Sequence, residues 1–129
     1  MASPLSSSLC ETVQSLLEDI RTVLADIESD SKVLSERVIS ERVIQLQPVF
    51  QEIVARLAEA GFTPSVEQRL RPLQTEGHRR LKLAGIAAMR LQTAKRVETV
   101  LAVRAQINEH LLQLQKFLVA IADELGDRD

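Results

Sequence analysis

The first sixty residues contain two stretches in which apolar side chains recur with helical spacing. In the first stretch they step by four and three positions and fall on one face of a helix: Leu9, Val13, Leu16, Leu17, Ile20, Val23, Leu24 and Ile27. Ser8 and Glu11 have the spacing of a capping box, which favours a helix start at Ser8. The segment Ser29–Ser31 is rich in turn formers. The pattern therefore predicts a helix over about residues 8–28.

The second stretch opens with a duplication, because Ser35–Ile39 is repeated at once as Ser40–Ile44. Five helical residues rotate by about 500°, so the copies do not share a face and the repeat cannot form a packing seam. Pro48 falls inside the helical pattern, which continues to about Ala60. We expect Pro48 to kink or restart this helix and to move Gln47 out of helical geometry.

The best-marked joint in the chain is Gly61-Phe62-Thr63-Pro64. Gly61 suits the left-handed residue that closes a helix, Thr63 suits an N-cap, and Pro64 suits the first helical position. We expect Pro72 to bend the third helix early, and Gly85 to cost about 1 kcal/mol relative to alanine. One face of this helix includes small residues, which predict close approach of a neighbour: Val66, Leu70, Leu73, Gly77, Leu81, Ala84, Ala88 and Leu91.

The joint before the last helix is poorly marked, because neither Gly nor Pro occurs between Thr93 and Thr99. We place the break near Arg96–Glu98. The last helix ends at Gly126, and its stripe contains a single charged residue: Val97, Leu101, Arg104, Ile107, Leu111, Leu114, Leu118, Ile121 and Leu125.

Together these stripes predict an all-α protein, an antiparallel four-helix bundle with kinked helices, because each stripe is too narrow to be stable alone and the loops are short. Composition supports this, since 45% of the 129 residues are apolar and the only aromatics are three phenylalanines. We expect one domain over residues 8–126, between a disordered segment 1–7 and a tail 127–129. Neither a signal peptide nor a membrane span is predicted, and the single cysteine, Cys10, fits a reducing compartment. We therefore expect a cytoplasmic protein.

The net charge of −2 conceals a segregation along the chain. Residues 1–60 carry five basic and ten acidic side chains, residues 64–104 carry nine and three, and residues 105–129 carry two and five. The basic third helix could pair with acidic neighbours inside the bundle, or part of it could face an acidic partner. The residues that we expect to bind such a partner are Arg79, Arg80, Lys82, Arg90, Lys95 and Arg96.

The sequence does not bring together the residues that catalysis or metal binding requires. His78 and His110 are the only histidines, and neither has another His or Cys three or four positions away. Cys10 has no histidine near it in sequence, and the four glycines form no phosphate-binding loop. An acidic pI of about 5.7 and the lack of stacking aromatics argue against nucleic acid. We therefore expect a non-enzymatic, protein-binding chain without cofactor, catalytic residue or metal.

Several segments carry a family resemblance: Val66–Leu70, Gln74–Glu76, Arg80–Leu83, Met89–Lys95 and Arg104–Ile107. In composition and spacing, over about residues 46–125, they resemble the PatD family, small cyanobacterial proteins linked to the control of heterocyst frequency. The chain departs from the family pattern at Leu83–Ala88, where the family has a bulkier and more acidic centre, and at Arg90, where an aromatic is usual.

The resemblance implies a helical bundle that modulates cell growth, division and differentiation and contacts the tubulin-like division GTPase FtsZ. The six basic residues named above would then dock FtsZ as the acidic partner. Three alternatives remain open. They are an export chaperone or adaptor of the flagellar type, which would hold a client helix in an apolar groove, a nucleic-acid-binding bundle, and a homodimer with the small-residue face as its seam.

Overall fold

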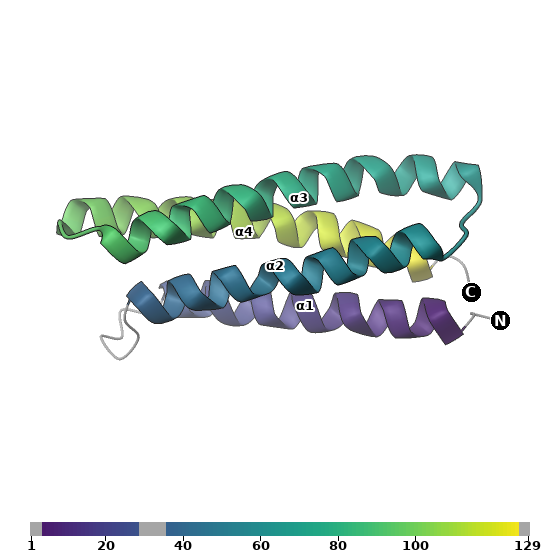
Figure 1. The fold of residues 1–129 in the computed structure, drawn as a ribbon, viewed down its shortest axis with the longest axis horizontal. Helices are drawn as coiled ribbons and strands as arrows, with labels where there is room; N and C mark the ends of the chain where they lie inside the picture. The colour runs from purple at the N-terminus through teal and green to yellow at the C-terminus, as the bar shows by residue number, and fades with distance from the viewer. Residues whose placement is uncertain (1–3, 29–35, 127–129) are drawn as a thin grey trace.

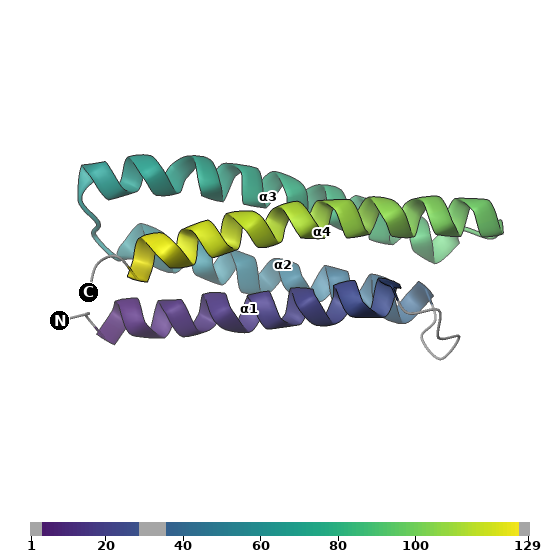
Figure 2. The ribbon, with the colours of Figure 1, turned by 180° about the vertical axis from the view of Figure 1, so that it is seen from behind.

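The computed structural model describes residues 4–28 and 36–126, and within these ranges every regular element is an α-helix. The helices are α1 (Pro4–Glu28), α2 (Glu36–Glu59), α3 (Pro64–Thr93) and α4 (Val97–Gly126). Successive helices run antiparallel, and the α1–α2 hairpin packs against the α3–α4 hairpin (Figures 1 and 2). The predicted all-α, four-helix bundle is confirmed.

Each helix packs mainly on two others, so the four surround one core: α1 packs on α2 and α4, and α3 packs on α2 and α4. The core is aliphatic apart from Phe50 and Phe62, and it extends from Leu9 in α1 to Leu125 in α4. In α1 the predicted stripe is buried from Leu9 to Leu24, and Ile27 is partly buried at its end. The apolar pattern therefore identified the inner face of α1 correctly.

The predicted start of α1 is wrong. The helix begins at Pro4, so residues 4–7 are helical and the boundary that we placed at residue 8 is too late. Proline at the first helical position lacks only an N–H that would have had no partner there. Ser8 is inside the helix, and its Oγ accepts a hydrogen bond of 2.6 Å from Arg56 Nη2 instead of capping the helix. The predicted end at residue 28 is correct, whereas the turn at 29–31 and the segments 1–3 and 127–129 lie outside the described residues.

Neither internal proline interrupts its helix. α2 continues through Pro48, so the predicted restart there and the predicted displacement of Gln47 from helical geometry are both wrong. α3 likewise continues through Pro72, and the kinks expected at the two prolines stay predictions. A proline removes one backbone hydrogen bond. In α2, Leu46 and Phe50 are buried in the core on either side of it, and this packing holds the helix together across the gap.

The joint before α3 forms as predicted. Gly61 has a φ of 66°, the left-handed conformation that closes a helix. Thr63 is the N-cap, with its side chain accepting from the Val66 N–H, and Pro64 is the first helical residue. At the other end of α3 the break spans residues 94–96, because α3 ends at Thr93 and α4 begins at Val97. It therefore starts two residues before the predicted position.

The small residues of α3 allow close contact with α2, as predicted. A Cβ atom on Gly77 would lie 3.2 Å from Cζ of the buried Phe50 ring. About three turns further along α3, the Ala88 carbonyl accepts a 2.7 Å hydrogen bond from the buried Ser40 Oγ of α2. Gly77, Ala84 and Ala88 are buried within the bundle, so this face is an internal seam, and the homodimer stays a prediction.

The two buried glycines of α3 are expected to respond oppositely to alanine. In Gly77→Ala the new methyl meets the fully buried Phe50 ring, which has little room to move, so we expect a loss of about 1–3 kcal/mol in unfolding free energy. In Gly85→Ala the methyl meets only the flexible end of Gln47, whose amide nitrogen would be 2.4 Å away. The amide can swing aside, so better helix propensity should raise stability by up to about 1 kcal/mol. Urea unfolding of both variants checks the pair, and a loss in both would show that Gln47 is not free to move.

Candidate partner-binding surface

The basic residues predicted to bind a partner do not form one strip. Two of them turn toward α4: Arg80 Nη1 lies 3.3 Å from His110 Nδ1, and Arg90 Nη1 donates a 3.3 Å hydrogen bond to Gln106 Oε1. Arg79 stays on its own helix and forms an exposed ion pair of 3.8 Å with Glu76. Arg80 and Arg90 therefore point toward α4, whereas Arg79 points in another direction around α3.

The other predicted residues fall at two separate places. Lys82 lines a cleft between α2 and α3, whereas Lys95 and Arg96 lie exposed in the loop that joins α3 to α4. Arg90, close to the end of α3, belongs with the loop residues. We define the hairpin end as the exposed group at this α3–α4 junction: Met89, Arg90, Lys95, Arg96, Val97 and Leu101.

The hairpin end exposes three large apolar side chains. Met89 is 63% exposed, Val97 is 72% exposed and Leu101 is 61% exposed. The apolar stripe of the last helix predicted Val97 and Leu101 in the core, and that prediction is wrong. Single exposed apolar residues are common on protein surfaces. Three near one junction, two of them from the apolar stripe of α4, raise the question why this part of the stripe is not buried.

Val97 and Leu101 are exposed because the four helices differ in length. α3 and α4 have 30 residues each, whereas α1 has 25 and α2 has 24. Arg104 of α4 donates to the last carbonyls of α1, at 2.9 Å from Ile27 O and 3.4 Å from Asp26 O. α1 therefore ends level with Arg104, and Leu101 and Val97 lie one and two turns beyond it. Figures 1 and 2 show the α3–α4 hairpin projecting past the other two helices.

The charge at the hairpin end is mainly positive. Arg90, Lys95 and Arg96 form no ion pair with any other described residue, and Arg90 bonds only to the neutral Gln106 amide. The nearest acidic side chain in sequence is the exposed Glu98. These three cations, which form no ion pair within the described ranges, lie near the three exposed apolar residues along the chain, and this combination would complement an acidic segment carrying apolar side chains.

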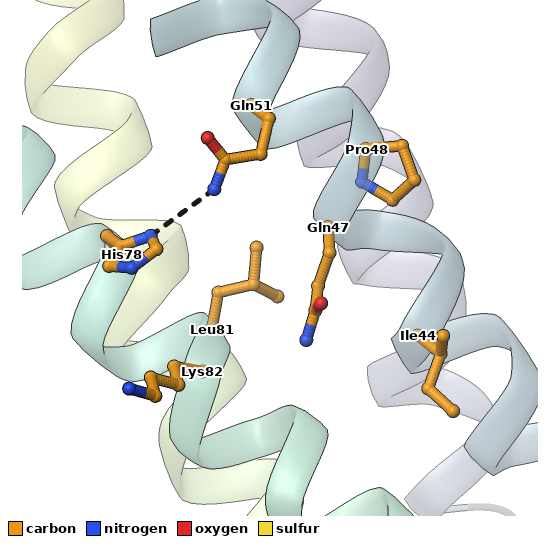
Figure 3. Close-up of a pocket in the computed structure, with 7 residues that line it drawn as sticks. All are labelled: Ile44, Gln47, Pro48, Gln51, His78, Leu81 and Lys82. Atoms are coloured by element: carbon orange, nitrogen blue, oxygen red, sulfur yellow. Dashed lines mark hydrogen bonds between the residues drawn. The ribbon is translucent and has the colours of Figure 1, made fainter.

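A second feature is the α2–α3 cleft, with a volume of about 540 Å³ (Figure 3). It is lined from the two helices by Ile44, Gln47, Pro48, Gln51, His78, Leu81 and Lys82. Gln51 Nε2 and His78 Nδ1 are 3.5 Å apart across it. The lining contains no carboxylate, hydroxyl or thiol, and its ionisable side chains are those of His78 and Lys82. This composition suits binding. Sequence reasoning placed Lys82 correctly on the surface but missed the cleft.

The described residues also hold no group of three or more His, Cys, Asp or Glu side chains that could bind a metal ion. No helix in the described ranges combines the length and apolarity needed to cross a bilayer.

The chain was compared with known proteins in three ways, and no protein family model, curated protein or solved structure matches it.

Arg80 of α3 and His110 of α4 form a polar contact between these two helices. The pKa of His110 is lowered from 6.5, first by burial and then by the positive charges of Arg80 and Arg79, with Glu109 acting in the opposite direction. Neutral His110 can accept a hydrogen bond from Arg80 at Nδ1, whereas the imidazolium would repel it. Arg80 Nε is buried and has no hydrogen-bond partner among the described residues. It therefore cannot compensate for the hydrogen bond that Arg80 would lose if His110 were protonated.

We expect this pair to make stability depend on pH. Because the folded-state pKa of His110 lies below its unfolded value of 6.5, the unfolded chain binds more protons as the pH falls through 6.5. The contribution of His110 is therefore full at pH 7.5 and declines toward pH 5.5. Urea unfolding at both pH values should show a smaller decline for His110→Gln than for the natural chain. Equal declines would contradict the assignment.

Proposed function

We propose that this chain is a non-enzymatic, protein-binding helical bundle that docks an acidic segment of a partner protein at the hairpin end. The observation that carries the proposal is the combination of three cations that form no ion pair with a described residue and three exposed large apolar side chains: Arg90, Lys95, Arg96, Met89, Val97 and Leu101.

The two kinds of side chain would act differently in binding. Covering Met89, Val97 and Leu101 removes apolar surface from water, at about 25 cal/mol per Å², and provides the affinity. The cations speed association and select an acidic sequence, and their effect weakens as salt screens it. An acidic segment with two or three aliphatic residues on one face matches both requirements. The Arg79–Glu76 ion pair lies outside this surface and is not part of the proposed contact.

FtsZ is the first partner to test, and it enters the proposal through the PatD resemblance alone. Part of that resemblance, the segment Met89–Lys95, lies in the hairpin end. On this reading the chain regulates cell division and growth by contacting the FtsZ polymer. An export chaperone of the flagellar type is less well supported, because its client groove would need the apolar stripes that the described helices bury against one another.

Sedimentation of FtsZ polymers with GTP provides the test. We expect the chain to pellet with the polymers at 50 mM salt and to dissociate as salt is raised. The variant Arg90→Glu/Lys95→Glu/Arg96→Glu should lower the affinity by roughly tenfold or more, because each reversed charge repels an acidic partner. Circular dichroism should show unchanged helicity, since all three side chains are exposed.

The matched control reverses three exposed basic residues elsewhere, Arg21, Arg71 and Lys116, none of which forms an ion pair with a described residue. It changes the net charge by the same amount and should bind FtsZ almost normally. An equal loss in the control would reject the hairpin end as the contact and leave only a net-charge effect. No pelleting at 50 mM salt would reject FtsZ as the partner.

A contribution from the apolar side chains is tested by Met89→Ser/Leu101→Ser. Both residues are more than 60% exposed, so we expect the unfolding free energy to change by less than about 0.5 kcal/mol. Partner binding should weaken, and the weakening should persist at high salt, unlike the effect of the charge reversals. A large loss of stability would show that these side chains pack within the bundle.

A further inference from the structure

Gly85 is a glycine in the interior of α3, where alanine would favour the helix. The structure gives its reason: a Cβ atom there would lie 2.4 Å from the amide nitrogen of Gln47. The missing side chain therefore lets the Gln47 amide from α2 lie against α3. That amide forms no hydrogen bond with any other described residue. The Gln47 side chain is partly exposed, so its amide is open to water and to a ligand that enters the cleft from solvent.

The Gln47 amide lies in the α2–α3 cleft, whose lining also includes His78 and Lys82 (Figure 3). The Lys82 ammonium points away from Gln47 in this view. Lys82 is exposed on the cleft wall and forms no ion pair with a described residue. When Gln51 donates to His78 Nδ1, the neutral imidazole carries its proton on Nε2 and becomes a donor there. The cleft therefore offers one ammonium group and neutral N–H donors, and its lining has no carboxylate to neutralise them.

The rest of the lining is apolar. Leu81 is buried at the base of the cleft, and Ile44 and Pro48 are exposed on the α2 side. A hydrated inorganic anion would gain nothing from these side chains, whereas a ligand with an aliphatic chain would cover them. The volume of about 540 Å³ is within the range of small-molecule sites.

We propose that the α2–α3 cleft binds a small aliphatic carboxylate. The exposed Lys82 side chain turns toward α2, the carboxylate accepts hydrogen bonds from Lys82 and the Gln47 amide, and the aliphatic chain lies over Leu81 and Ile44. A single ammonium group with neutral N–H donors matches the charge of one carboxylate, and such charge-assisted hydrogen bonds are the strong ones. This site is separate from the hairpin end, so its occupancy does not depend on the proposed docking of a partner protein.

The test is a titration of the ¹⁵N-labelled full chain with hexanoate, followed by NMR. We expect saturable shifts at the cleft residues with a dissociation constant of about 1–10 mM, since the ligand has few heavy atoms. Hexanamide keeps the chain length without the charge and should bind at least fivefold more weakly. Hexylammonium carries the opposite charge and should cause no saturable shift at the cleft. Equal shifts with hexanoate and hexylammonium would overturn the proposal.

Two variants separate the contribution of the Lys82 ammonium to hexanoate binding from that of the Gln47 amide. Lys82→Met keeps the aliphatic stem and should weaken hexanoate at least fivefold, while Lys116→Met, outside the cleft, should leave it unchanged. Gly85→Ala keeps every lining residue but displaces the Gln47 amide, so hexanoate should weaken about threefold without any loss of thermal stability. If Gly85→Ala is poorly folded, Gln47→Leu tests the same amide. Unchanged affinity in Lys82→Met, or in both amide variants, would contradict the proposed binding mode.

Discussion

The contact between the Phe50 ring and Gly77 sets how closely α2 can approach α3, and much of the bundle depends on it. The ring fills the space that a larger residue on α3 would occupy, and Leu114 of α4 closes the same space from the other side. One interlocking contact therefore involves three helices. Because the rest of the core is aliphatic, with Phe62 near its rim as the other aromatic side chain, few other contacts fix the spacing so firmly. Ser40 and Gln47 reach α3 from the same face of α2 only because the helices are this close.

Much of the fold could be predicted from the sequence, because burial on one face leaves a periodic signal. The inner face of α1 and the joint at Gly61–Pro64 were predicted correctly, since each depends on neighbouring residues. The start of α1 and the course of α2 through Pro48 were not, because local signals compete there with packing that only the folded chain reveals. A capping pattern at Ser8 is outweighed by a helix that begins earlier and places Ser8 beside Arg56.

The candidate surfaces were harder to predict, and for a definite reason. Periodicity assigns Val97 and Leu101 to an inner face but does not tell how far the neighbouring helix extends, and α1 ends at Arg104. The basic residues were found by composition, but their directions around α3 depend on partners such as His110 and Gln106 in another helix. The cleft left one trace in the sequence, the unfavourable glycine at position 85, and its meaning requires knowing that Gln47 lies opposite.

Residues 36–44, the described part of the tandem pentapeptide, show how identical residues take different roles within α2. Ile39 in the first copy is fully buried, whereas Ile44, its counterpart in the second, is 38% exposed and lines the cleft. Sliding α2 by one copy would put identical residues at the positions of the second copy, but it would bring the polar Gln45 to the fully buried position of Phe50. The core would lose the Phe50 ring and bury an amide without a partner, which costs several kcal/mol. The duplication therefore creates no second register, and α2 has one way to lie in the bundle.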